Sequence, residues 1–235
     1  MNIKSVCLLA VAPALAFMLS ACSNDDIADL LAGESVTISG TITGTRGVAL
    51  ENVRVEAVYS SPGGALNPVA ITDAGGNYAL QVFKNDTLYL HVSKSAYVTT
   101  NTARASFDVD QINIDLTIYS EAEAQAVIDA AFVSTAPVLI NHDWLLIDLF
   151  DVNGDELNGQ TVISTLMPTE HAYTECDGTD SGGAVTTGAP CPVDREAPMY
   201  IAYFDSPGET SISVDGGAMV VPIRMGEFTY VVFEP

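Results

Sequence analysis

Basic residues are scarce in this sequence. Its 235 residues include eight Lys and Arg against 30 Asp and Glu, which gives a formal net charge of −22. A chain this acidic is repelled by phosphate backbones and by anionic lipid surfaces, which excludes general nucleic-acid binding. Charged residues make up only 16% of the chain and apolar residues 48%. That composition excludes an intrinsically disordered protein.

The sequence also lacks a hydrophobic run long enough to cross a membrane as a helix. The apolar stretch at residues 6–19 spans 14 residues, whereas a membrane-spanning helix needs about 20. This stretch follows a short basic start at residues 1–4 and leads into small residues, which is the layout of a secretory signal. Residues 1–21 are therefore predicted to be a signal peptide.

The end of that segment, Leu19-Ser20-Ala21-Cys22, resembles the lipobox of bacterial lipoproteins. In that family the cysteine is lipidated and becomes the first mature residue, and two acyl chains give stable anchoring. Ser23 stands where an Asp would favour retention in the inner membrane. The resemblance implies lipidation of Cys22 and an outer-membrane protein facing the periplasm or the cell surface, with residues 22–34 as a tether. An ordinary cleaved signal is the alternative.

Only two cysteines remain once Cys7 and Cys22 are assigned to the signal and the anchor. Cys176 and Cys191 are predicted to form a disulfide, because exported proteins meet an oxidising compartment. The bond closes a loop of about 15 residues and stabilises the fold by roughly 3 kcal/mol in the chain-entropy model. The alternatives are free thiols or a zinc site with His171, although neither cysteine lies in a Cys-x-x-Cys pair.

Period-two alternation of apolar and polar residues runs through residues 35–119. The alternating runs begin at Val36, Val53, Tyr78, Leu88 and Ile112, and the last of them is the most regular. Turns rich in Gly, Pro, Asn and Asp separate the runs. Short strands at this spacing predict a small antiparallel β-sandwich with one buried face per strand.

Three segments of this region resemble the carboxypeptidase regulatory-like family, which has a transthyretin-like seven-strand sandwich. They are Ser39-Gly40-Thr41-Ile42, the hairpin at residues 47–55, and Thr72-Asp73-Ala74-Gly75-Gly76-Asn77-Tyr78. One departure is Ala96, which replaces the usual glycine before Tyr97. The resemblance implies a non-catalytic accessory module and supplies no catalytic residues.

The second half of the chain resembles a copy of the first. Ser120 and Glu123 form a capping box that predicts a short helix in a linker at residues 120–136. Beyond it, a shift of 107 places aligns residues 47–55 with 154–162, and a shift of 122 aligns residues 78–92 with 200–214. The predicted fold class is therefore all-β. It comprises two small antiparallel sandwiches, transthyretin-like or Ig-like, at residues 35–119 and 137–235, joined by one short helix.

One segment of the second half has oxygen-bearing side chains at the alternate positions that calcium favours, Asp151, Asn153 and Asp155. Glu156 and Val162 stand where a calcium loop of the EF-hand type has Gly and Glu. A hairpin turn is therefore the preferred interpretation and a weak calcium site the alternative. No other cofactor or metal is expected.

No convincing catalytic group is present. Asp180-Ser181-Gly182-Gly183 resembles the tetrapeptide around the nucleophile of trypsin-like proteases, but Thr179 replaces the preceding Gly and no Ala-His-Cys segment accompanies it. The segment is interpreted as a glycine-rich loop. The three histidines are dispersed, and the alternation predicts that His91 faces solvent. The protein is therefore not expected to be an enzyme.

Charge and one aromatic cluster bear on partners. Residues 119–235 hold 19 acids and two basic residues, a net of −17, against −3 for residues 34–118. Trp144, after His142 and Asp143, is a candidate glycan contact, with a place in the core as the alternative. The sequence favours an envelope-anchored binding, presentation or accessory structural module, whose partner is an envelope protein or a glycan. A carbohydrate- or calcium-binding surface module is the alternative, and a hydrolase comes third.

Overall fold

The computed structural model describes residues 34–60, 67–132, 137–149, 162–174, 186–187, 199–214 and 217–233. Within these ranges the chain is built of β-strands and one α-helix, α2 (Glu121–Ala131), with a 3₁₀ turn at Leu139–Asn141. No helix in this part of the chain is long and apolar enough to cross a membrane. The all-β fold class predicted from the sequence is confirmed.

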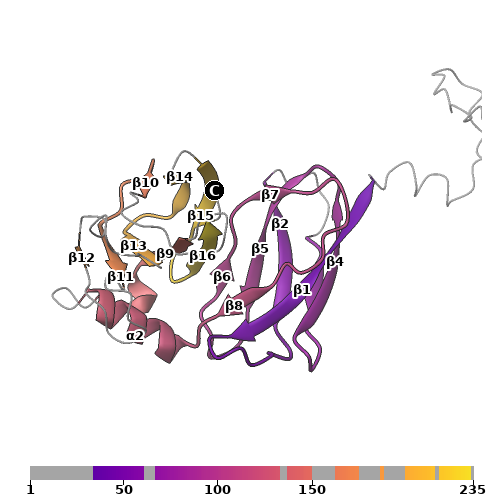
Figure 1. The fold of residues 1–235 in the computed structure, drawn as a ribbon, viewed down its shortest axis with the longest axis horizontal. Helices are drawn as coiled ribbons and strands as arrows, with labels where there is room; N and C mark the ends of the chain where they lie inside the picture. The colour runs from indigo at the N-terminus through magenta and orange to yellow at the C-terminus, as the bar shows by residue number, and fades with distance from the viewer. Residues whose placement is uncertain are drawn as a thin grey trace, which may run out of the picture. The chain divides into compact units, whose positions relative to one another are not determined.

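The first sandwich contains eight strands. They are β1 (Ser35–Gly44), β2 (Arg54–Tyr59), β3 (Val69–Ile71), β4 (Asn77–Phe83), β5 (Thr87–Ser93), β6 (Thr100–Asn101), β7 (Ala105–Ser106) and β8 (Leu116–Ile118). One sheet has the order β4-β1-β8, and the opposite sheet has β3-β2-β5-β6 (Figure 1). Both sheets contribute to one core, formed by Val36, Ile38, Ile42, Leu50, Val53, Val55, Ala57, Tyr78, Leu80, Val82, Leu88, Leu90, Val92 and Ile118.

The alternation in the sequence predicted most of these strands correctly. In β4 the buried residues Tyr78, Leu80 and Val82 alternate with exposed or half-buried neighbours. The same phase buries Val55 and Ala57 in β2. Inward side chains are separated by outward ones because successive residues of a strand point to opposite faces.

The run from Ile112 to Ile118, the most regular in the sequence, is not one strand. Only β8 is extended and paired, and Ile112 is 74% exposed. Asn113 has a positive φ of 63°, which interrupts the extended backbone. The chain here runs parallel alongside β1 with one extra residue, because Ile38 pairs with Gln111 and Ile42 with Leu116. Between these pairs, the Asp115 carboxylate accepts hydrogen bonds from the N–H and the hydroxyl of Thr41, both at 2.7 Å.

The capping box predicted the helix correctly. The Ser120 hydroxyl accepts from the Glu123 N–H at 3.3 Å, and the Glu123 carboxylate accepts from the Ser120 N–H at 3.1 Å. These bonds satisfy donors that the first turn of a helix leaves free. The helix buries Ala124, Ile128 and Ala131.

The second sandwich repeats the strand order of the first. Its strands are β9 (Asp143–Leu149), β10 (Ile163–Ser164), β11 (Glu170–Thr174), β12 (Thr186–Thr187), β13 (Met199–Phe204), β14 (Gly208–Val214), β15 (Gly217–Ile223) and β16 (Phe228–Phe233). The sheet β13-β9-β16 corresponds to β4-β1-β8, and each has its parallel pair, β9–β16 or β1–β8. The antiparallel set β10-β14-β15 corresponds to β2-β5-β6. The described strands of the two halves therefore share this order.

A single large sheet connects the two sandwiches. The last strand, β16, pairs in parallel with both β9 and β6, so the sheet runs in the order β12-β11-β13-β9-β16-β6-β5-β2-β3. The fold is therefore mixed rather than purely antiparallel, because β1–β8, β9–β16 and β6–β16 are parallel.

The part of the large sheet that belongs to the second sandwich is covered on both faces. On one face Leu145 and Ala202 pack in a core with β14 and β15. On the other face Trp144 and Phe228 pack in a core with α2. Near-continuous burial of β9, from Trp144 to Ile147, follows from this three-layer arrangement.

Candidate functional site

Several candidate residues from the sequence lie outside the described ranges. They are Cys22, Asp151, Asn153, Asp155, Cys176, Ser181 and Cys191. Lipidation, the disulfide and the calcium alternative therefore stay predictions. Among the residues that the structure does describe, no group of three His, Cys, Asp or Glu side chains is arranged to hold a metal ion.

Trp144 is a core residue, and the glycan-contact hypothesis for it is corrected. Its side chain is fully buried, and its indole Nε1–H donates to the Leu139 carbonyl at 2.9 Å. Its ring lies 5.4 Å from the Tyr203 ring and 6.0 Å from the Phe132 ring, centroid to centroid. A sugar needs an exposed ring face, and Trp144 has none.

The histidines lie in three different environments. His142 contacts Asp205, with 3.0 Å between Nδ1 and Oδ1, and its ring lies 4.6 Å from that of Tyr203. His171 packs against the Tyr200 ring at 5.5 Å. The side chain of His91 is only 24% exposed and its Nδ1 lies 2.9 Å from Asn101 Oδ1, so the prediction of a solvent-facing His91 is wrong.

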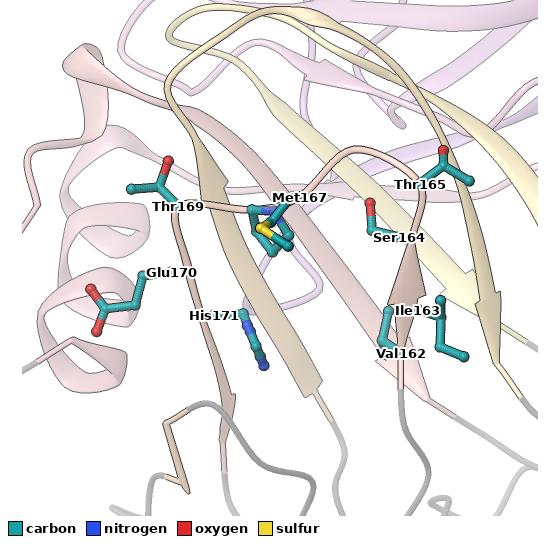
Figure 2. A pocket seen from close by; sticks show the side chains of 9 residues that line it. Val162, Ile163, Ser164, Thr165, Met167, Thr169, Glu170 and His171 are labelled. Carbon is teal, nitrogen blue, oxygen red and sulfur yellow. The ribbon is translucent and has the colours of Figure 1, made fainter.

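A groove opens between β10 and β11 (Figure 2). It has a volume of about 680 Å³. Its lining comes from β10, from the loop that follows and from the start of β11: Val162, Ile163, Ser164, Thr165, Met167, Pro168, Thr169, Glu170 and His171. Ile163 is 62% exposed and Met167 88% exposed. Exposed apolar side chains gathered around a concavity are typical of a binding surface.

The titratable groups of this groove are Glu170 and His171. Figure 2 shows Glu170 and His171 on opposite sides of β11, as strand geometry requires. Glu170 accepts from the Tyr203 hydroxyl at 3.2 Å. Burial lowers the pKa of His171, and the nearby Glu170 carboxylate only partly opposes this shift. The groove therefore offers apolar contact and hydroxyl groups for binding.

A second notable cluster lies where the two sandwiches meet. Arg104 donates through its guanidinium to Glu209 and to Ser60, and its backbone N–H donates to the Val220 carbonyl at 2.9 Å. The guanidinium lies 5.1 Å from the centre of the Tyr89 ring. Arg224 approaches the same ring at 5.6 Å and donates to the Tyr89 hydroxyl at 2.9 Å.

The sequence analysis did not identify the Arg104 cluster, although the scarcity of basic residues was a signal for it. With eight basic residues in 235, each one is a candidate for a specific ion pair. Arg104 and Arg224 both contact the buried ring of Tyr89. Cations held against a desolvated aromatic face contribute more than exposed ones.

We expect Arg104→Met to lower the free energy of unfolding by about 2 kcal/mol, because it removes charge-assisted hydrogen bonds and a cation–π contact. Urea unfolding measures the loss. Arg54→Met is the matched control: Arg54 also pairs with a glutamate, Glu56, but its side chain is 43% exposed against 11% for Arg104. The control should cost less than about 1 kcal/mol. Equal losses in the two variants would contradict a stabilising role of Arg104 between the two sandwiches.

No family profile matches this sequence, and no curated protein matches it. Solved structures of low similarity are found. A DUF3823 family protein from Parabacteroides merdae has a TM-score of 0.32 and 8% identity, over 82% of this chain and 98% of that one. A minor pilin from Streptococcus agalactiae has a TM-score of 0.26 and 10% identity, over 85% of this chain and 94% of that one.

The Bacillus anthracis TIE protein has a TM-score of 0.27 and 11% identity. The match covers 85% of this chain but only 33% of that protein. Likenesses at this level establish neither a family nor a function for the chain.

Proposed function

We propose that this chain is a non-catalytic module of the bacterial cell envelope, anchored by lipid on Cys22, that presents a binding surface to an envelope partner. The single observation that carries this proposal is the continuous sheet through both sandwiches, in which β16 pairs with β9 and β6. Strand pairing across the junction, together with the Arg104 cluster, makes the two sandwiches one stiff body.

The order of the parts along the chain supports a presenting role. The predicted tether at residues 22–34 leads directly into the first sandwich, and the groove beside Ile163 belongs to the second. Along the chain, the first sandwich therefore comes between the predicted anchor and the groove. The resemblance of residues 36–118 to the carboxypeptidase regulatory-like family supports the same assignment to an accessory module.

The anchor is tested by expressing the full chain and its Cys22→Ser variant in a Gram-negative host. We expect the wild-type protein to fractionate with the outer membrane and to carry acyl chains detectable by mass spectrometry. The variant should be released into the soluble periplasmic fraction. Membrane association that survives the substitution would overturn the lipid anchor and leave the groove hypothesis standing.

The groove is tested by crosslinking in intact cells with Ile163→Asp. Ile71→Asp is the matched control, because Ile71 is a comparably exposed isoleucine of β3, at 56% against 62%. We expect one stoichiometric envelope protein that is lost with Ile163→Asp and kept with Ile71→Asp. Loss with both variants, or no specific protein, would contradict presentation through the groove. Binding to glycans, or a melting temperature that rises with calcium, would favour the alternative module.

A further inference from the structure

A chain of polar contacts crosses the junction beside the Arg104 cluster. His91 Nδ1–H donates to Asn101 Oδ1 at 2.9 Å, and Asn101 Nδ2–H donates to Glu227 Oε2 at 2.8 Å. His91 and Asn101 belong to the first sandwich, and Glu227 immediately precedes β16 of the second. His91 Nδ1 lies 3.8 Å from the same Glu227 oxygen.

Backbone hydrogen bonds join three segments at one crossing beside Glu227, namely β9, β16 and the segment before β6. The Trp144 N–H donates to the Glu227 carbonyl at 3.1 Å, and the Phe228 N–H donates to the Thr99 carbonyl at 2.9 Å. The first bond ties β9 to the start of β16, and the second ties β16 to the segment before β6. A change of charge at this crossing therefore acts on both sandwiches.

Asp143, the first residue of β9, is the unusual group at the crossing. It is 1% exposed, and neither carboxylate oxygen has a hydrogen-bond partner. A buried polar group without a partner costs free energy, and a buried charge costs more. Asp143 is the one described carboxyl group with both oxygens buried and unpartnered.

Burial and two acidic neighbours favour the neutral form of Asp143. Burial raises its pKa, the nearby carboxylates of Glu227 and Asp205 raise it further, and only His142 opposes the shift. Around His91, Glu227 lies on one side, and Glu56 faces it across the β2–β5 pair. Protonation of Asp143 removes a negative charge beside Glu227.

We propose that Asp143, Glu227 and Asn101 form an acid-strengthened joint, which holds the two sandwiches together more firmly as the pH falls. A proton taken up by Asp143 neutralises an unpartnered buried carboxylate beside Glu227, the residue that accepts a hydrogen bond from Asn101 across the junction. The joint is a property of the folded body and does not depend on the lipid anchor or on the groove.

The sign follows from linkage. A carboxyl group whose pKa is higher in the folded than in the unfolded chain binds more protons when folded, so its contribution to stability falls as the pH rises. For Asp143 the contribution is complete below the ordinary pKa of an aspartate, and it is lost as the pH rises through the higher pKa of the folded protein.

The Asp143→Asn variant tests this, with unfolding of the full chain in detergent micelles followed between pH 4 and pH 8. We expect the variant to raise the folding equilibrium constant about tenfold at pH 8, with the gain shrinking towards pH 4. Asp108→Asn is the control, since it removes one exposed negative charge elsewhere. Equal effects of the two variants at every pH, or a variant that is less stable than wild type at pH 8, would overturn the proposal.

Hydrogen exchange of the wild-type protein supplies a second readout that needs no variant to fold. We expect amides of β6 and β16 to lose about tenfold more protection between pH 5 and pH 8 than amides of the β2–β5 ladder, after correction for intrinsic rates. A uniform loss across all strands would show that the joint has no special response to acid.

Discussion

We expect Gly40→Ala to destabilise the protein more than the addition of one methyl group at any other position of β1. A Cβ built on Gly40 would lie 2.1 Å from the carbonyl oxygen of Ile114 and 2.4 Å from its carbonyl carbon. Both neighbours are backbone atoms of the segment that runs alongside β1, so no side-chain rotation relieves the overlap. We expect a loss of about 3 kcal/mol or more in the free energy of unfolding, measured by urea denaturation.

Gly44→Ala is the matched control, at the other end of the same strand. Its nearest neighbours would be the two methyl carbons of Leu50, at 3.9 and 4.0 Å. An alanine there makes ordinary contacts and reduces the freedom of the unfolded chain, so stability should stay within about 0.5 kcal/mol of wild type. A similar loss for both variants would show that the Ile114 backbone does not require glycine at position 40.

The sequence indicated that Gly40 matters but not why. Its place in the opening strand was part of the resemblance to the carboxypeptidase regulatory-like family. The physical reason is the close approach of the Ile114 backbone, which lies in the run that the alternation predicted to be a strand. Hydrophobic alternation predicts which side chains point inward, but it does not predict whether the backbone between them stays extended. At Asn113 the alternation continues in the sequence, but the positive φ interrupts the extended backbone.

The repeat was predictable because it leaves a local trace: the same hairpin and the same apolar spacing recur after the helix. The pairing between the two sandwiches was not predictable, because it depends on which edge strand of one pairs with which edge strand of the other. β6 has two residues and β16 pairs with it over two positions, Phe228 with Thr100 and Thr229 with Asn101. So short a contact has no sequence pattern of its own.

The sequence analysis did not identify the charged groups at Arg104 and Asp143, for a related reason. Charged side chains are expected at the surface, and nothing local distinguishes Arg104 or Asp143 from exposed ones. A retrospective signal exists for Asp143, because it opens the run Trp144–Ile147, in which every residue is buried. A carboxylate that begins such a strand must either find a partner or take up a proton.

Replacing Trp144 by alanine is expected to cost about 4 kcal/mol, the range seen when a fully buried large aromatic is removed. The ring fills the core beneath α2, where it packs with Phe132, Tyr203 and Phe228. The substitution also leaves the Leu139 carbonyl without its indole donor. Trp144 is the only tryptophan of the chain, so unfolding of this variant is followed by circular dichroism rather than by fluorescence.

Two controls separate a core residue from a sugar-binding one. Trp144→Phe keeps an aromatic ring but loses the hydrogen bond to Leu139, and we expect it to cost about half as much as alanine. Ile140→Ala removes an apolar side chain from the same neighbourhood that is 72% exposed, and its effect should stay within about 0.5 kcal/mol. If Trp144→Ala retained wild-type stability and instead abolished binding to a glycan, the ring would have to be reachable from solvent. The assignment of Trp144 to the core beneath α2 would then be wrong.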